Sequence, residues 1–137
     1  MRSLNAACFL LLLSLPMHAL VARADQGNGK TFVTYDRGQD TCGQVIEARR
    51  FKKHENTSYS IWLAGYITAY NHHKKDTSDI LGKSTLKSEN PMAGPMAWIE
   101  RYCADHPMNL FMVAADAFTD YQYPKRLSIG EKIQSTQ

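Results

Sequence analysis

Two adjacent histidines are the first residues of this chain whose types suggest chemistry. His72 and His73 follow the apolar stretch "IWLAGYITAYN" and precede Lys74 and Lys75. Two histidines that bind one metal from a helix stand three or four positions apart, because only those positions face the same way. Adjacent helical side chains diverge by about 100°, and the two lysines would repel a cation. The sequence therefore predicts no metal site.

Asp105 and His106 are the one acid–base pair that the sequence offers for catalysis. Nucleophilic catalysis requires a Ser, Thr or Cys held by a base and a third orienting group. The chain contains no GxSxG, no HExxH and no glycine-rich phosphate loop. The pair directly precedes Pro107, and helix is disfavoured just before a proline. We therefore interpret the pair as a helix terminus and expect a non-enzymatic protein without a cofactor; a small exported enzyme is the least favoured alternative.

The first 24 residues have the layout of a cleaved secretory signal peptide. Arg2 gives a positive start, residues 6–15 are apolar, and Ala22 and Ala24 occupy the two positions that a signal peptidase reads. The apolar segment is too short to span a bilayer. We therefore expect residues 1–24 to be removed, which would leave a periplasmic or secreted protein with no membrane anchor.

Signal cleavage would also change the cysteine count and the charge. Cys42 and Cys103 would remain, and two cysteines in an oxidising compartment usually pair. A reactive thiol pair is the alternative, although nothing here resembles a CxxC redox site. With Arg2 and Arg23 removed, 14 of the 16 Lys and Arg residues and all 13 acids remain, so the formal charge falls from +3 to +1. That balance argues against nucleic-acid binding, and we interpret the basic run at 48–54 as a solvated helix end.

Four segments with helical periodicity predict an all-α fold, a small four-helix bundle spanning residues 41–123. The first helix begins with a capping box at Thr41 and ends where the polar run "KKHENTS" begins at Lys52. The second, 58–71, is apolar on nearly all sides, which predicts a central position in the core, and Asn71 would end it. The third begins at Pro95 and stops before Pro107, and the last covers 109–122.

Two details of these helices carry expectations about packing. Gly65, in the middle of the second helix, lowers helix stability by roughly 1 kcal/mol relative to alanine. We expect close approach by another helix or by the Trp98 ring to offset that cost. The disulfide would join the first helix to the third. The apolar stripe by which the last helix is predicted to face the core comprises Leu110, Val113, Ala114, Ala117, Phe118 and Tyr121.

Outside the helices, the sequence predicts a flexible lead-in at 25–40, a polar stretch at 72–90 and a mobile tail at 124–137. Because binding residues concentrate on loops, the stretch 72–90 is either a connector or the surface that meets a partner. Its apolar residues Ile80, Leu81 and Leu86 are expected to pin it to the core. Its candidate partner-binding residues are His72, His73, Lys74, Lys75, Asp76 and Asp79.

The order of motifs resembles that of two groups of small exported bacterial proteins. The motifs are "TCGQVIEAR", "IWLAGYITAYN", "AWIERYCADHP" and "NLFMVAADAF", which together cover about 41–121. One group is the HdeA/HdeB family of periplasmic acid-stress chaperones. The other is the Rap1a/Tai group of periplasmic immunity proteins, which neutralise peptidoglycan-cleaving effectors. Both resemblances imply a helical protein with one disulfide, for which Cys42 and Cys103 are the matching cysteines.

We therefore expect a non-enzymatic periplasmic protein-binding module. The first resemblance implies an acid-stress chaperone that exposes apolar surface at low pH, although the acids of this chain are spread out rather than clustered. The alternative is an immunity protein that presents a loop to a cell-wall-degrading effector, for which the stretch 72–90 is the candidate. In both cases the partner is another protein, and no nucleic acid, cofactor or membrane is expected.

Overall fold

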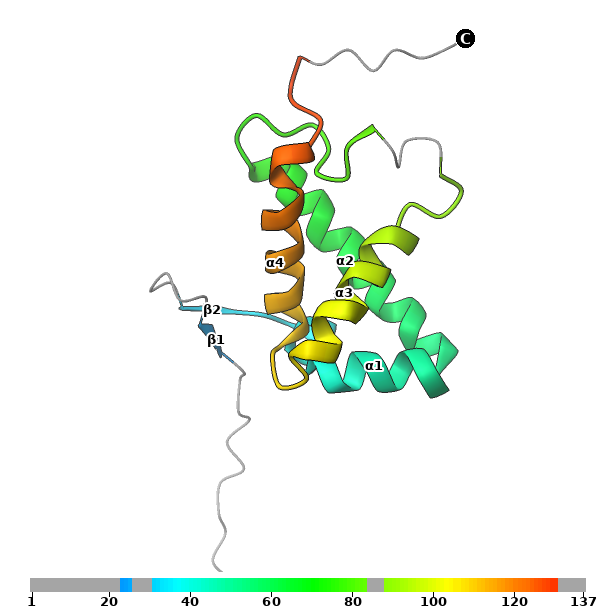
Figure 1. Cartoon of the computed structure of the whole chain (residues 1–137). Coiled ribbons are helices and arrows are strands. Elements are labelled where there is room, and N and C mark those ends of the chain that lie inside the picture. Colours follow the sequence, from blue (N-terminus) through cyan, green and yellow to red (C-terminus); the bar gives the residue numbers. More distant parts are fainter. Residues whose placement is uncertain (1–22, 26–30, 84–87, 131–137) are drawn as a thin grey trace, which may run out of the picture.

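Helices dominate the computed structural model, which describes residues 23–25, 31–83 and 88–130 of the chain (Figure 1). A small antiparallel sheet pairs β1 (Arg23–Asp25) with β2 (Thr31–Val33), and the 3₁₀ helices η1 (Asp36–Gln39) and η3 (Tyr123–Lys125) flank the bundle. The prediction of a helical bundle is confirmed, with the small sheet in addition. The α-helices are α1 (Cys42–Phe51), α2 (Lys53–His73), α3 (Ala93–Asp105) and α4 (Phe111–Gln122).

The junction between α1 and α2 is a single non-helical residue, Lys52, with φ −136° and ψ 73°. The predicted capping box is confirmed, because the Gln44 N–H donates to Thr41 Oγ1 at 3.4 Å and the Thr41 N–H donates to Gln44 Oε1 at 2.7 Å. The prediction that "KKHENTS" separates two helices is wrong, since α2 already begins at Lys53. This run is polar, but it contains neither Gly nor Pro, and Lys and Glu are good helix formers.

The end of α2 also differs from the prediction. Asn71 does not end the helix, which continues through His73. Its side-chain amide instead holds the following loop, because Asn71 Oδ1 accepts the Ile80 N–H at 2.9 Å and Asn71 Nδ2 donates to Asp79 at 3.2 Å. Ile80 and Leu81 are buried as expected, whereas Leu86 lies outside the described residues.

The core is one cluster of buried side chains to which all four helices contribute. In Figure 1, α1 lies across one end of the bundle and packs against both α2 and α3, while α4 packs against α3. The ring of Tyr59 in α2 meets that of Phe111 in α4 edge-on, with 5.2 Å between the centroids. Tyr59, Leu63 and Phe111 are fully buried, so the central position expected for α2 is confirmed on this face.

The buried stripe of α4 is displaced from the predicted one. Of the predicted residues only Ala114 and Phe118 are buried, and Tyr121 is 51 % exposed. Apolar residues occur on most sides of this helix, so periodicity alone permits several neighbouring stripes. Contact with Tyr59 selects the stripe that begins at Phe111, whose buried members are Phe111, Ala114, Ala115, Phe118 and Thr119.

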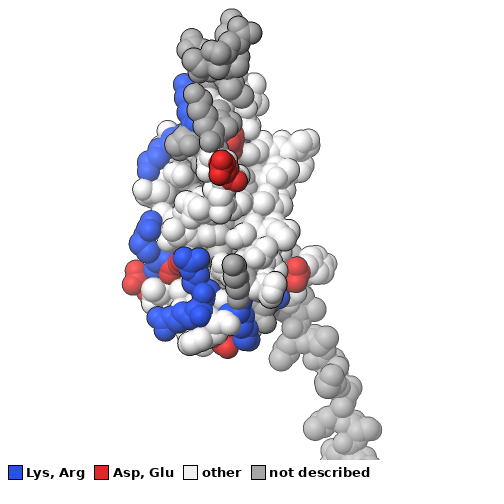
Figure 2. Space-filling view, turned by 90° about the vertical axis from the view of Figure 1, so that its right-hand side faces the viewer, with Lys and Arg blue, Asp and Glu red and all other residues white. Residues whose placement is uncertain are grey.

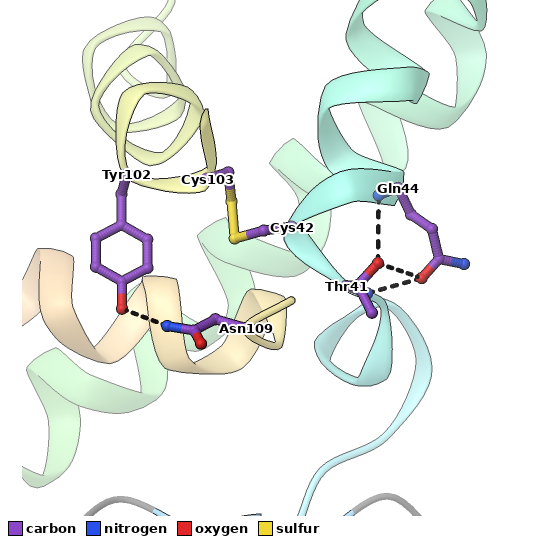
Figure 3. Close-up of a disulfide and its surroundings, with 6 residues drawn as sticks. All are labelled: Thr41, Cys42, Gln44, Tyr102, Cys103 and Asn109. Carbon is purple, nitrogen blue, oxygen red and sulfur yellow. Dashed lines mark hydrogen bonds between the residues drawn. A yellow bond between two sulfur atoms is a disulfide. The ribbon is translucent and has the colours of Figure 1, made fainter. Parts of the chain in front are cut away.

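Figure 3 shows the predicted disulfide, which is confirmed and joins Cys42 at the start of α1 to Cys103 near the end of α3. The two Cα atoms are 4.7 Å apart, although 61 positions separate them in the sequence. Beside it, the Cys42 N–H donates to the Asn109 carbonyl at 2.8 Å and the Gly43 N–H donates to the Pro107 carbonyl at 2.9 Å. The turn between α3 and α4 thus supplies acceptors for the unpaired N–H groups at the start of α1.

The lead-in, predicted to be flexible, is held against α2 from Thr34 onward. Gly38 in η1 is buried, and Trp62 Nε1 of α2 donates to the Tyr35 carbonyl at 3.1 Å. The Tyr59 hydroxyl donates to the carboxylate of Asp40 at 2.7 Å. Side-chain contacts with α2, which local sequence does not reveal, account for the difference.

The tail, predicted to be mobile, is fixed as far as Leu127. This side chain is 1 % exposed, and its N–H donates to the Asp79 carbonyl at 2.8 Å. Its own carbonyl accepts the Ser78 N–H at 2.8 Å. Residues 131–137 lie outside the described part of the chain. The segment after Pro124 therefore packs against the loop that follows α2. We call the two together, residues 72–81 and 123–127, the corner after α2.

The predicted signal peptide lies almost wholly outside the described residues, which begin at Arg23. Cleavage after Ala24 would remove two of the three residues of β1. Among the helices of the described ranges, none is long and apolar enough to cross a membrane.

Reduction of the Cys42–Cys103 bond is expected to lower the melting temperature of the mature chain by about 15 °C. A crosslink that closes a loop of about 60 residues stabilises a fold by roughly 4 kcal/mol in the chain-entropy model. Circular dichroism melts with and without a phosphine reductant measure the effect. The double variant Cys42→Ala, Cys103→Ala should melt at the lower temperature under both conditions, and a wild-type melt indifferent to reductant would contradict the pairing.

Candidate functional site

An apolar groove lies where the lead-in, α2 and α4 meet. Its volume is about 420 Å³, and none of its lining residues carries a charged side chain. Three of its large apolar residues are exposed: Tyr35 is 74 % exposed, Ile61 68 % and Val33 44 %. Apolar residues that remain exposed together around a hollow are typical of an interaction site. The lining residues are Val33, Thr34, Tyr35, Ile61, Trp62, Gly65, Tyr66 and Met112.

One wall of the groove is a pair of stacked aromatic rings on α2. Trp62 and Tyr66 are one helical turn apart, and their rings lie 5.8 Å apart and almost parallel, at 4°. Each ring is anchored by its polar end. Trp62 Nε1 donates to the Tyr35 carbonyl at 3.1 Å, and the Tyr66 hydroxyl donates to the carboxylate of Asp116 in α4. This wall is therefore fixed before any partner arrives.

Gly65 forms the floor of the groove. The expectation that another helix or the Trp98 ring approaches Gly65 is wrong, since a Cβ atom added there would meet no heavy atom within 4 Å. The Trp98 ring instead stacks on Tyr102 at 5.7 Å and on Tyr121 at 5.5 Å. No packing within the described chain offsets the helix-weakening effect of Gly65. Its missing side chain instead leaves the backbone of α2 uncovered at this point.

Behind the aromatic wall, Asp116 is a carboxylate in a largely apolar setting. Burial raises the pKa of Asp116; the hydrogen bond from Tyr66 opposes this shift, and the neighbouring charge of Asp120 adds to it. Burial and the same hydrogen bond raise the pKa of Tyr66, so this hydroxyl stays protonated. Asp116 Oδ2 and the Tyr70 hydroxyl are buried without a hydrogen-bond partner among the described residues. The folded chain therefore takes up a proton at Asp116 more readily than the unfolded chain does.

The candidate partner-binding residues lie together at and just after the C-terminal end of α2, and none of them lines the groove. His72 and His73 form the exposed last turn of the helix, with their rings edge to face and 4.6 Å between centroids. The exposed Lys74 places its Nζ 4.9 Å from the ring centroid of Tyr123 and 5.4 Å from that of Tyr70. The corner thus presents basic side chains on an aromatic support.

The acidic members of this set maintain the shape of the corner. Asp76, with φ 51°, pairs with Arg126 at 2.9 Å, and its backbone carbonyl accepts from Arg126 Nε at 2.8 Å. The Asp79 carboxylate accepts the Leu81 N–H at 3.0 Å and the amide of Asn71 at 3.2 Å. The structure therefore brings the predicted residues together but assigns Asp76 and Asp79 to intramolecular contacts.

The other residues that suggested chemistry serve as helix termini. α3 ends at Asp105, and the His106 ring lies 4.5 Å from that of Tyr102. Among the residues that the structure describes, no group of three or more His, Cys, Asp or Glu side chains is placed to hold a metal ion.

Basic side chains gather at the α1 end of the molecule. Figure 2 shows Lys and Arg side chains concentrated toward the lower end of its view, with acids among them. Arg49 pairs with Glu100 at 3.3 Å and Lys52 pairs with Glu47 at 3.5 Å. Arg49 and Lys52 therefore each have an acidic partner within the chain.

Sequence reasoning missed the groove, because it assigned the apolar residues of α2 to the core and Tyr35 to a flexible segment. The signal that could have revealed it is a glycine in mid-helix beside Ile61, with no partner to explain it. No family model matches this chain, and neither a curated protein nor a solved structure is significantly similar to it.

Substitution of Gly65 by alanine is expected to stabilise the fold by about 1 kcal/mol, because alanine is the better helix former and the added Cβ meets nothing. Urea unfolding of the mature chain measures the change. Gly38→Ala is the matched contrast, since a Cβ there would collide with Thr34 Oγ1 and the Trp62 ring, and it should destabilise by about 1–3 kcal/mol. A destabilised Gly65→Ala variant would mean that the groove floor is packed.

Asp116→Asn is expected to reduce the pH dependence of stability in weak acid. Because the pKa of Asp116 is raised in the folded chain, its ionised form destabilises the fold at neutral pH, and protonation relieves this cost as pH falls. The stabilising contribution is complete below the ordinary aspartate pKa and lost as pH rises through the raised one. Urea unfolding between about pH 4 and 7 measures the free energy of unfolding. This free energy should rise in wild type relative to Asp116→Asn as the pH falls.

Tyr66→Phe tests the same titration in the opposite direction, because this variant keeps the Asp116 carboxyl and should raise its pKa further. It removes the hydrogen bond that lowers the pKa of Asp116, so the stability of this variant should depend on pH over a wider range than that of wild type. Parallel pH profiles for wild type and Asp116→Asn would contradict the titration.

Proposed function

We propose that this chain is an exported, non-enzymatic protein-binding module that holds an apolar segment of another protein in the groove. The observation that carries the proposal is Gly65, which leaves α2 open at the floor of an uncharged groove while Tyr35 and Ile61 stay exposed at its rim. Aromatic and apolar anchors around a hollow are typical of protein-binding surfaces. Because no lining residue is charged, the segment bound there is uncharged.

The more specific form of the proposal is a periplasmic acid-stress chaperone. Unfolded client proteins offer apolar segments of the kind that the groove would accept. The uptake of a proton by Asp116 favours the folded chain in acid, which supports a groove that persists when clients unfold. In this form of the proposal the client binds to the folded chaperone, and no unfolding of the chaperone is required.

A second candidate function is that of an immunity-type inhibitor, and the corner after α2 favours it. The corner is tied down by Arg126 and Asp76 while His72, His73 and Lys75 remain exposed. A loop held in one conformation loses little entropy on binding a folded target. For this candidate the partner is a cell-wall-degrading effector with an acidic surface, and unfolded protein would not compete for it.

Gly65→Leu is expected to weaken client binding at least about ten-fold, because the leucine side chain fills the floor of the groove. The measurement is light scattering, with increasing mature protein, of a client that aggregates near pH 7 on dilution from urea without reductant, and of an acid-unfolded client near pH 3. Gly94→Leu is the matched control, since Gly94 is also helical with nothing near its Cβ position and does not line the groove.

The control should suppress aggregation as wild type does. Failure of wild type to suppress aggregation at either pH would overturn the chaperone proposal. Equal activity of wild type and Gly65→Leu would overturn the groove as the binding surface.

A further inference from the structure

One side of the groove is extended backbone rather than helix. Val33 ends β2, and Tyr35 keeps the extended conformation, with φ −125° and ψ 160°. The opposite side consists of α2 and α4, through Gly65 and Met112. The groove therefore lies beside a short strand edge, which is the kind of element that can pair with another chain.

The backbone of this edge is not saturated. The Tyr35 carbonyl accepts the Gly38 N–H at 3.2 Å and Trp62 Nε1 at 3.1 Å. Within the described part of the chain, the Tyr35 N–H donates to no acceptor. In an extended strand the N–H and C=O groups of one residue point to the same edge. Because the Tyr35 carbonyl points at Trp62 in the groove wall, its N–H also faces the groove side.

The neighbouring residue on that edge is Val33, because positions two apart in a strand share an edge. Val33 is paired with Arg23 of β1. The predicted signal cleavage after Ala24 would remove Arg23, and the backbone of Val33 would then lose this cross-strand partner. In the mature chain Val33 would lack its register partner, and the Tyr35 N–H would remain the unpaired backbone donor beside the groove.

We propose that the partner binds as a strand: an extended, uncharged segment of another protein pairs with the Val33–Tyr35 edge and lays its alternate side chains into the groove over Gly65. This inference rests on the proposed function and specifies the conformation of the partner. A helix satisfies its own backbone groups and would leave the Tyr35 N–H unpaired at a buried interface, which is unfavourable. A strand supplies a carbonyl for that N–H, and alternate side chains give apolar contact.

The test compares Tyr35→Pro with Tyr35→Ala in the mature chain, because both variants lose the ring but only proline loses the N–H. The probe is reduced, carboxymethylated α-lactalbumin, and its affinity is measured by fluorescence anisotropy. Tyr35→Pro is expected to bind roughly five-fold more weakly than Tyr35→Ala, the effect of one backbone hydrogen bond. Hydrogen exchange in wild type should slow at least about ten-fold at the Tyr35 amide when the probe is saturating.

The outcomes separate the two proposals. Suppose that both Tyr35 variants bind alike and the Tyr35 amide is not protected, while Gly65→Leu still abolishes binding. The proposal that the partner binds as a strand is then overturned, whereas the proposal that it binds in the groove is kept. If wild type does not bind the probe, both proposals fail. Circular dichroism melts show whether the variants fold. If Tyr35→Pro does not fold, protection of the wild-type Tyr35 amide from hydrogen exchange decides whether the partner binds as a strand.

Discussion

The Cys42–Cys103 disulfide closes the junction at which the lead-in, the start of α1 and the turn between α3 and α4 meet. Around it, backbone hydrogen bonds run in both directions, from Cys42 to the Asn109 carbonyl and from Phe111 to the Asp40 carbonyl, each at 2.8 Å. The disulfide and these hydrogen bonds thereby hold together segments roughly 60 to 70 residues apart in the sequence. A domain of roughly 110 residues has a modest core, so this covalent link is the constraint from which the remaining contacts follow.

The groove is one consequence of that junction. Asp40, which is held at the junction, accepts the buried hydroxyl of Tyr59 at 2.7 Å. This contact fixes η1 against α2, where Gly38 has no room for a side chain beside the Trp62 ring. The chain before η1 must then pass over α2, and the Tyr35 carbonyl meets Trp62 Nε1. The extended wall of the groove is therefore positioned by the same bonds that close the core.

Signals that act locally in the sequence are sufficient for the helices and the disulfide. Thr41 with Gln44 specifies a helix start in any surroundings, and the rule that two cysteines pair in an oxidising compartment needs no knowledge of the fold. The groove depends instead on which side of α2 the lead-in and α4 leave uncovered. A helix that is apolar nearly all round gives no indication of that side, so Gly65 suggested a packed contact and Asn71 a helix end. Both interpretations needed the positions of residues distant in sequence.

A falling pH acts on the groove through one buried carboxylate. The corner after α2 is fixed instead by the Asp76–Arg126 pair at 2.9 Å, and neither residue lines the groove. At the groove, the raised pKa of Asp116 means that protonation removes an unfavourable buried charge behind Tyr66. A falling pH therefore removes an unfavourable charge behind the aromatic wall, and a function that depends on the groove retains its binding surface in acid.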